Sequence, residues 1–504
     1  MNLYNNIANV LSKSGIKLAV GNMYDYMEMW KEWYAGDVQD FHHYSARLAD
    51  GKTVSLERLT MNMPKKICED VAKLLWTEKT EIQLESKENS KALWKVLDNK
   101  INNFSKNFPV FIEKVLALGN GVLIEYKDNG NTTIDYVPGD LFIPYKYTNS
   151  YIYGIITISR FTEIENPDDE PKSKTTYFTH ITYHEYEDGK YRTKHELYKS
   201  NADNELGKEV KDEIFSEYYP NLKKEDEIET DVPYFQVVSL NLANNLDMSS
   251  PLSVSLFANS IDRFKSIDTK YDSFMNEFKL GKKRILVDSS TLKAKATPDE
   301  KGNIQYVRYF DTEDQVYVAV EGMEKQPAKE IDFSLRTNEH ITAINSELNW
   351  LSDNVGLGTE WYQFNGSGVK TATEVISENS KAFRTREHLL TGINDVVIDL
   401  VKAVCKLEGI ESKDITITPD DSIIVDKNTE RTMDLMEVQQ GLMSKETYLK
   451  NTKGLSEKQA KDELAKIDSE KMSNQELFGF PTEENPDNTP QKAKEENDKK
   501  IEEK

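Results

Sequence analysis

The residues that could bind a metal ion or catalyse a reaction are few in this sequence, and their spacing matches no familiar site. His180 and His184 lie four residues apart in a segment rich in β-formers, so they fall on one face of an expected strand. No third ligand follows at a recognisable spacing. The His-Glu pairs that begin at His184 and His195 lack the second histidine of a zinc-protease helix. We therefore expect no metal site.

Two further segments have only a superficial likeness to nucleotide-binding or nuclease motifs. In GSGVKT, Lys370 follows Val369 where a phosphate-binding loop requires glycine, and the G-x-x-x-x-G spacing is absent. The nearest candidate for paired catalytic carboxylates is Asp420 with Asp421. Pro419 precedes this pair between two strand-like runs, which favours a turn over a metal-dependent nuclease site. With no Ser/His/Asp arrangement either, we expect no enzyme activity and no cofactor.

The composition limits the classes of partner and compartment. Of 504 residues, 64 are Lys or Arg and 87 are Asp or Glu, which gives a formal charge of −23. Such a chain is a poor DNA binder overall, because non-specific affinity comes mainly from cations. Neither a signal-peptide core nor an apolar run of the roughly 18 residues that span a bilayer occurs, so we expect a soluble cytoplasmic protein. Cys68 and Cys405 are expected to be buried free thiols.

The chain begins with helical periodicity. In MYDYMEMWKEWYAG the aromatic residues recur at helical spacing, and Gly36 is a natural C-terminal stop. Apolar residues between Leu56 and Leu75 indicate an amphipathic helix, which Pro64 either interrupts or begins. From about residue 117 the period changes to that of strands. Turn residues at Asp128-Asn129-Gly130 and at Glu187-Asp188-Gly189 predict hairpins in an antiparallel sheet.

Two long helices are predicted to enclose a small β segment. Apolar residues from Val254 to Phe278 are spaced by three or four positions, which predicts one helix ended by Gly281. Short strand-like runs follow, and a second helix is predicted from about Thr337 to Val355. If the two helices pair antiparallel, they form a stalk that holds the β segment at its tip.

A glycine-rich aromatic loop follows the second helix. Gly356 and Gly358 can end that helix, Gly366 and Gly368 add a second flexible point, and a new helix of some 35 residues begins after Thr371. Thr371 and Glu374 have the spacing of a capping box. The sequence therefore predicts a mobile hinge between two long helices.

This order of elements resembles the portal proteins of tailed bacteriophages, in the branch typical of phages of Gram-positive hosts. The matching order is long helix, β insert, second long helix, VGLG, aromatic loop, and KTATEV opening another long helix. Further matches are W-x-x-W-Y-x-G at Trp30 to Gly36, LTMNMPKKICEDVAKLL, ALGNGVLIEY at 117–126, and IDTKYDSFMNEF. The similarity extends over residues 20–470 or so.

The resemblance implies an α+β portal fold whose subunits assemble as a ring. Its parts in chain order would be a wing over 1–250, helical first and then antiparallel β; stem helices over 251–281 and 334–355, with a small α/β clip over 282–333 between them; a tunnel loop over 356–370; a long tunnel or wing helix over 371–412; strands returning to the wing over 413–426; a helical crown over 427–473; and a disordered acidic tail over 474–504.

The resemblance also implies a function. A ring of about twelve subunits at a single capsid vertex would be the channel through which double-stranded DNA is packaged and ejected. Its partners would be the terminase large subunit, which supplies ATP hydrolysis, a head-completion or adaptor protein, and the major capsid and scaffolding proteins. No membrane partner is implied. The protein would reside in the virion, and in the host cytoplasm during assembly. The alternative is another ring-forming virion protein, such as a head-tail adaptor.

Three groups of residues are implied to carry this function. The residues expected in the tunnel loop and facing DNA are Gly356, Gly358, Trp361, Tyr362, Phe364, Gly366, Gly368 and Lys370. The aromatic ones either touch DNA and neighbouring subunits or pack against the adjacent wing, and Lys370 either touches phosphate or starts a helix in solvent. The residues expected to pack the stem are Phe257, Ile261, Phe264, Tyr271, Phe274, Phe278, Ile344 and Leu348. Lys282, Lys283 and Arg284 form a basic cluster at the clip, which either meets phosphate or complements the helix dipole.

Overall fold

The computed structural model describes residues 7, 11–12, 22–47, 51–149, 151–165, 174–281, 284–288, 293–298, 304–309, 317–320, 328–331, 334–364, 372–420, 434–453 and 460–467. The chain divides into two compact units, Met1–Ile424 and Val425–Lys504. No helix among the described residues is long and apolar enough to cross a bilayer.

The first helices of the larger unit supply much of its core. Helix α2 (Met23–Ala35) buries the side chains of Trp30 and Trp33 and ends at Gly36, whose φ of 75° is left-handed, as predicted. A short helix, α3 (Gln39–His42), leads into the hairpin β1 (His43–Arg47) and β2 (Thr53–Glu57). Helix α4 (Met63–Leu75) has Pro64 in its first turn. Pro64 therefore begins the helix, and Leu56 lies in a strand instead.

Helix α6 (Phe104–Leu118) packs on a small sheet of β12 (Phe235–Ser239), β4 (Asn120–Asp128) and β5 (Asn131–Pro138). The contact is close, because a Cβ added to Gly121 would lie 2.7 Å from the Phe111 ring and 2.8 Å from Val115. Helix α5 (Lys87–Leu97) lies beside β3 (Glu81–Gln83), which pairs with β18 (Thr416–Thr418). A strand from the predicted 413–426 segment thus returns to the N-terminal region.

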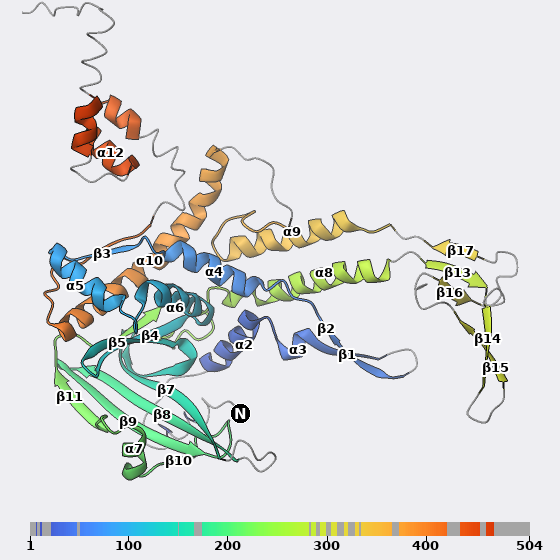
Figure 1. Ribbon diagram of the computed structural model, residues 1–504, viewed down its shortest axis with the longest axis horizontal. Helices are drawn as coiled ribbons and strands as arrows, with labels where there is room; N and C mark the ends of the chain where they lie inside the picture. Colours follow the sequence, from blue (N-terminus) through green and yellow to red (C-terminus); the bar gives the residue numbers. More distant parts are fainter. Residues whose placement is uncertain are drawn as a thin grey trace, which may run out of the picture. The chain divides into compact units, whose positions relative to one another are not determined.

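A larger antiparallel sheet follows the small one (Figure 1). It contains β6 (Phe142–Thr148), β7 (Tyr151–Glu165), β8 (Lys174–Glu187) and β9 (Lys190–Ser200), with β10 (Lys208–Glu209) and β11 (Glu225–Glu229) both paired to β9. Helix α7 (Asp212–Tyr218) follows β10. Both predicted hairpin turns are present, since Asn129 and Gly130, and likewise Asp188 and Gly189, have positive φ.

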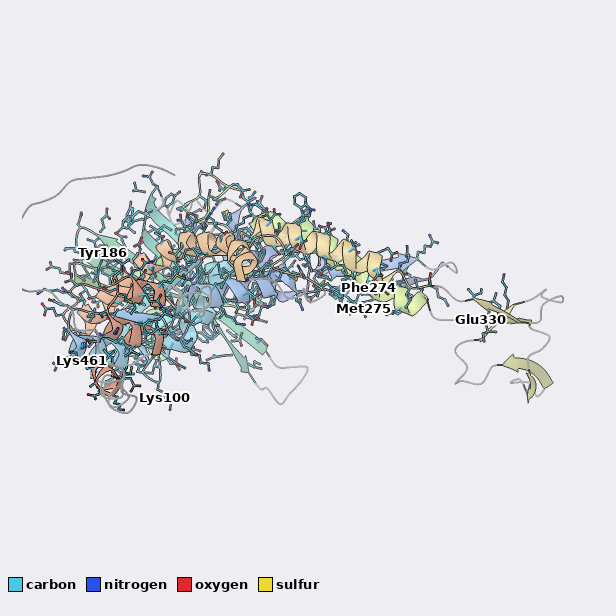
Figure 2. All side chains as sticks on the ribbon, turned by 90° about the horizontal axis from the view of Figure 1, so that it is seen from above. Lys100, Tyr186, Phe274, Met275, Glu330 and Lys461 are labelled. Carbon is cyan, nitrogen blue, oxygen red and sulfur yellow. The ribbon has the colours of Figure 1, made fainter. Side chains whose placement is uncertain are left out.

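The predicted pair of long helices is present with one corrected boundary. Helix α8 (Ile261–Leu280) begins after a 3-10 turn at Ala258–Ser260, so Val254 and Phe257 precede it, although both are buried. Their apolar spacing reflects burial in the core and not a helical turn. Helix α9 (Thr337–Asn354) agrees with its predicted range. The two helices lie side by side (Figure 1 and Figure 2).

The described residues between α8 and α9 form strands. Strand β13 (Arg284–Asp288) pairs in parallel with β16 (Tyr317–Val320) and antiparallel with β17 (Ala328–Ile331). Strands β14 (Lys293–Pro298) and β15 (Ile304–Tyr309) form a separate hairpin. None of the residues described here forms the helix that an α/β clip would add.

The last helix of the larger unit is α10 (Ala372–Glu408), which matches the predicted long helix and packs on the small sheet and on α4. Cys68 in α4 and Cys405 in α10 are buried free thiols, as expected. In the smaller unit, α12 (Lys445–Lys453) and the residues 434–439 and 460–467 are helical, within the predicted crown segment. The predicted tail, 474–504, lies outside the described residues.

Candidate functional site

The two long helices α8 and α9 are joined by a charged cluster around Glu347 of α9. Its carboxylate accepts hydrogen bonds from Arg263 (3.2 Å), Ser266 (3.0 Å) and Lys270 (2.8 Å), all on α8. These donors recur at helical spacing, so one face of α8 is directed at α9. Partial burial opposes ionisation of Glu347, but the donors outweigh it, and the pKa of this carboxyl lies below its ordinary value.

A second cluster joins the same helices nearer to the β segment, with the roles of the helices exchanged. Here Glu277 of α8 accepts bonds from the Arg336 guanidinium and backbone N–H (2.9 Å each) and from His340 Nε2 (2.6 Å). The Arg336 contacts lower the pKa of Glu277 to about 2, with His340 adding to the effect. Because α8 residues in ascending order meet α9 residues in descending order, the helices are antiparallel, as predicted.

The apolar residues predicted to pack these helices differ in burial and in partners, and the Phe264 ring lies 5.8 Å from Trp33 of α2 and 5.5 Å from Phe257, measured between ring centroids. Phe264, Phe274, Ile344 and Leu348 are buried, whereas Ile261 and Tyr271 are half-buried. The Phe274 ring lies 5.2 Å from His340 and 6.0 Å from Phe364, measured between ring centroids. Phe278, another predicted packing residue, is 42% exposed. The pair thus combines an apolar seam with one glutamate-centred cluster on each helix.

The aromatic segment after α9 is held against α4 and α9 by polar groups. Tyr362 is only 8% exposed, and its hydroxyl donates to Asp70 of α4 (3.1 Å). Its backbone N–H donates to Ser352 Oγ (3.2 Å), and the N–H of Phe364 donates to Asn345 Oδ1 (2.7 Å). The described part of the predicted hinge is therefore packed against α4 and α9.

Glycine is required where this segment leaves α9. Gly356 and Gly358 have φ values of 80° and 92°. A Cβ at Gly356 would lie 2.4 Å from Thr385 Oγ1, and that hydroxyl donates to the Gly356 carbonyl (2.7 Å). α10 thus fixes the start of the loop. The predicted loop residues Gly366, Gly368 and Lys370 lie outside the described residues, as do Lys282 and Lys283; Arg284 begins β13.

An open groove of about 630 Å³ runs beside the aromatic segment. Trp361, Tyr362 and Phe364 line it on one side; the other lining residues come from α4, the residues before α4, and α9, and include Met61, Met63, Lys66, Asp70, Lys73 and Leu348. Lys66 is paired with Asp70 (2.6 Å), and Lys73 is paired with Glu69. The charged lining residues are thus two lysines and one aspartate, and each lysine is paired with a carboxylate of α4.

Sequence reasoning did not identify the residues that hold the aromatic segment. Asp70, Asn345 and Ser352 are single polar residues within amphipathic helices, and Asp70 is 292 positions from its partner Tyr362. The one available signal was the polar pair Asn345 and Ser352 on the otherwise apolar side of α9, seven positions apart and so on one helical face.

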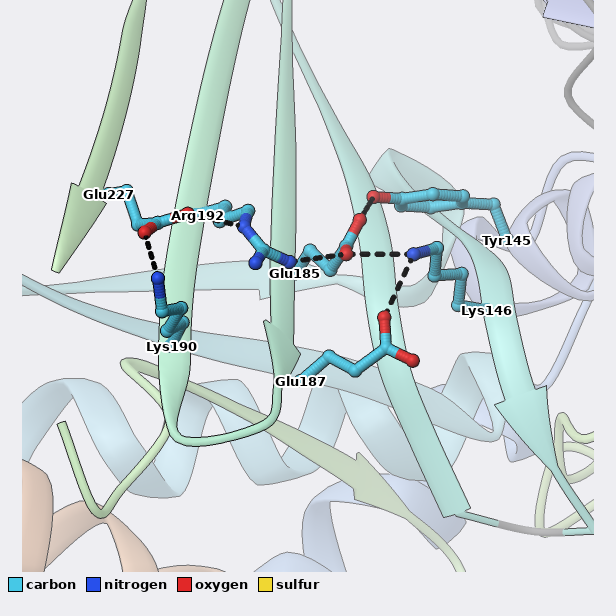
Figure 3. Close-up of polar contacts among 7 residues, drawn as sticks. All are labelled: Tyr145, Lys146, Glu185, Glu187, Lys190, Arg192 and Glu227. Atoms are coloured by element: carbon cyan, nitrogen blue, oxygen red, sulfur yellow. Dashed lines mark hydrogen bonds and ion pairs between the residues drawn. The ribbon is translucent and has the colours of Figure 1, made fainter. Parts of the chain in front are cut away.

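The densest charge cluster on the large sheet is internally neutralised (Figure 3). Glu185 accepts from Tyr145 (3.1 Å), Lys146 (2.7 Å) and Arg192 (3.2 Å). Arg192 also binds Glu227 (2.7 Å) on β11. This network ties β6, β8, β9 and β11 together, and its carboxylates are occupied by cations from neighbouring strands, so it suits a structural brace better than a catalytic site.

The histidines singled out in the sequence lie inside the same sheet. His180 Nε2 lies 3.2 Å from His195 Nδ1, and His184 bonds to Tyr191 (2.7 Å) and Thr157 (3.2 Å). Burial lowers the pKa of His180 and of His195 to about 4. Among the residues that the structure describes, no group of three potential ligands could hold a metal ion. Asp420 accepts a bond from Thr77 (3.1 Å), a structural role.

Comparison with known proteins identifies the family to which the chain belongs. A family model described as "Phage portal protein, SPP1 Gp6-like" matches residues 20–477. Among solved structures, a chain of the virion of a native gene transfer agent particle is similar over 78% of this chain and 89% of its own, with 9% identity and a TM-score of 0.41. A chain of the neck of such a particle, computed with C12 symmetry, is similar over 77% and 88%, with 9% identity and a TM-score of 0.38. Among curated proteins none matches. The chain belongs to the SPP1 Gp6-like family of phage portal proteins.

Proposed function

We propose that this portal protein forms a ring of about twelve subunits at one capsid vertex, through which double-stranded DNA enters and leaves the head. The observation that carries the proposal is the antiparallel pair α8 and α9, held by the Glu347 and Glu277 clusters. Two helices joined at both ends of their contact form a stiff strut, and a ring of such struts is a suitable wall for a channel under load. Membership of the portal family supports this role.

In this proposal each segment has a place in the ring. The residues before 251 are the wing, 282–333 the clip that the terminase large subunit contacts, and 427–473 the crown. The loop 356–370 faces the channel. Tyr362 anchors the loop to α4 and is therefore not free to touch DNA. The residues proposed to contact DNA are Trp361, which is half-buried at the groove, and the loop residues from Phe364 to Lys370. The subunit acts without catalysis of its own.

The acidic composition fits a channel in which DNA must move. The chain carries 64 basic and 87 acidic side chains. An ionic contact between a basic side chain and a phosphate is favourable because it releases counterions when it forms. Many such contacts would slow translocation, since each would have to be broken before the DNA could advance. Further proposed partners are a head-completion or adaptor protein and the capsid and scaffolding proteins, and the proposed host is a Gram-positive bacterium.

Native mass spectrometry with negative-stain microscopy tests the proposal. We expect rings of about twelve or thirteen subunits with an open centre. A chain that remains monomeric, even with the capsid and scaffolding proteins of the same virus, would contradict it. Co-expression with those proteins also separates a portal from a head-tail adaptor: a portal enters the empty procapsid, whereas an adaptor joins only a head that already contains DNA. Metal-dependent cleavage of DNA would contradict a purely structural role.

A further inference from the structure

Three Asn-Gly steps occur in the sequence, beginning at Asn120, Asn129 and Asn365. In this dipeptide the following backbone nitrogen reaches the asparagine side chain with least hindrance, because glycine has no Cβ. Such a step can therefore lose its side-chain amide without an enzyme wherever the backbone is free to move. Asn365 lies outside the described residues. The structure places the other two asparagines in opposite environments.

Asn120, at the start of β4, is fixed within the core. It is fully buried, its amide group donates to the Ser253 carbonyl (2.9 Å), and its side-chain oxygen accepts bonds from the Ser253 N–H (3.0 Å) and the Ser239 hydroxyl (3.0 Å). Gly121 is paired within the small sheet, and a Cβ there would touch the Phe111 ring of α6. Reaction at this step therefore requires core elements to separate, which is the most costly kind of opening.

Asn129 and Gly130 form the two-residue turn between β4 and β5, since Asp128 pairs with Asn131. Both turn residues are exposed, and a Cβ at Gly130 would meet no atom within 4 Å. Among the described residues, the Gly130 N–H has no hydrogen-bond acceptor, and the Asn129 amide group donates only to the adjacent Asp128 carboxylate (3.0 Å). Rotation within this exposed turn is therefore enough to bring the Gly130 nitrogen to the side chain of Asn129.

We propose that Asn129 deamidates spontaneously in the folded protein, and that this change loosens the end of the β4–β5 hairpin. In the first step the Gly130 nitrogen forms a bond to Asn129 Cγ, the bond from Cγ to Nδ2 breaks, and ammonia leaves with the proton of the Gly130 N–H. Water then opens the cyclic imide at one of its two carbonyls, which yields aspartate or isoaspartate. The reaction needs only water, and the inference does not depend on the proposed ring.

The end of this hairpin contacts the last residue of α10. Lys127 and Thr132 pair across the hairpin; Lys127 Nζ lies 3.5 Å from Glu408 Oε1, and the Thr132 hydroxyl donates to the same carboxylate (2.5 Å). Isoaspartate adds one carbon to the backbone, and a two-residue turn with positive φ at both positions does not accommodate it. Either product also places a second carboxylate beside Asp128. The strand ends, and with them the contacts to Glu408, therefore open more readily after the reaction.

Peptide mapping by mass spectrometry tests the site, with Asn120 as the internal control. The full-length chain is incubated in mildly alkaline buffer, either folded or in denaturant, and cleavage after Lys127 separates the peptides of Asn120 and Asn129. In the folded chain we expect Asn129 to react at least about tenfold faster than Asn120, because only Asn120 requires the core to open. In denaturant the two rates should agree within about threefold, since glycine follows both asparagines. Equal rates in the folded chain, or a faster reaction at Asn120, would overturn the proposal.

Asn129→Gly is the matched variant for the effect on the hairpin, because Gly-Gly suits the same turn and has no side-chain amide. After incubation, hydrogen exchange over residues 127–132 should be at least about threefold faster in the deamidated wild type than in fresh protein, and unchanged in Asn129→Gly. Unchanged exchange in the deamidated wild type would overturn the loosening of the hairpin. Equal acceleration in Asn129→Gly would overturn its assignment to Asn129.

Discussion

Removing the hydroxyl of Tyr362 should loosen the aromatic segment by a defined amount. In Tyr362→Phe the ring stays in place, but the hydrogen bond to Asp70 Oδ2 is lost. Asp70 keeps its other oxygen on Lys66 (2.6 Å) and therefore is not left unpaired. The loss is that of a single hydrogen bond to a carboxylate, about 1.5–3 kcal/mol in the local free energy of opening. Tyr362→Ala removes the buried ring as well and should cost about 3–5 kcal/mol.

Hydrogen exchange by mass spectrometry measures this opening directly. The N–H groups of Tyr362 and Phe364 bond to Ser352 and Asn345, so both exchange only when the segment opens. At 25 °C we expect Tyr362→Phe to accelerate exchange in this segment about 13- to 160-fold, which is the free-energy range above expressed as a rate ratio. Tyr271→Phe on α8, a half-buried tyrosine, is the control. Fast exchange in the wild type, unchanged in both variants, would refute the anchored segment and favour a mobile finger.

Three further predictions concern the pair of helices α8 and α9 and the helices that pack on the small sheet. Glu347→Gln should destabilise the α8–α9 contact by about 1–3 kcal/mol, because three donors lose a charged acceptor; unchanged hydrogen exchange in both helices would contradict this. Gly121→Ala should destabilise the contact between the small sheet and α6 by about 1–3 kcal/mol through overpacking. Gly392→Ala should instead stabilise α10 by about 0.5–1 kcal/mol, because a Cβ at Gly392 would meet its nearest neighbour, the Ser239 carbonyl oxygen, only at 3.7 Å. The thermal unfolding midpoint should therefore fall in Gly121→Ala and rise in Gly392→Ala. Equal shifts in the two variants would refute the reasoning. The pKa of Glu277 is depressed to about 2 from 4.5, so its contribution to stability is complete above pH 4.5 and is lost as the pH falls through about 2; a carboxyl NMR titration midpoint near 4.5 would refute the cluster.

Sequence reasoning succeeded where the determining chemistry is local. The turns at Asn129-Gly130 and Asp188-Gly189 follow from residues that accept positive φ, and the limits of α9 follow from periodic apolar residues. It failed at the start of α8, because Val254 and Phe257 are buried in a non-helical stretch, and apolar spacing alone does not distinguish this from a helix. Pro64 had two interpretations, and tertiary packing decided between them.

The candidate site was predictable only in outline. Apolar spacing indicated that α8 and α9 pair, but the contacts that attach other segments to them join residues far apart in the chain. Asp268 meets Met61 at a separation of 207 residues, and Thr385 meets Gly356 at 29. No periodicity marks such residues, since each needs one partner in one place. The described part of the predicted loop, residues 356–364, lies outside any helix, but the residues of α4 and α9 that hold it were not identified from the sequence.

Two buried polar residues within α8 and α9 show how this attachment is specified. Asp268 of α8 is 3% exposed, and Ser352 of α9 is fully buried. An apolar residue at either position would preserve the helix, but a buried backbone N–H without an acceptor costs about 1–3 kcal/mol, so each polar side chain selects the arrangement that satisfies it. Asp268 thereby fixes the segment between β2 and α4 through the Met61 N–H, and Ser352 fixes the aromatic segment through the Tyr362 N–H. Apolar spacing determines that the two helices pair, and these two side chains determine which segments the pair holds on its outer sides.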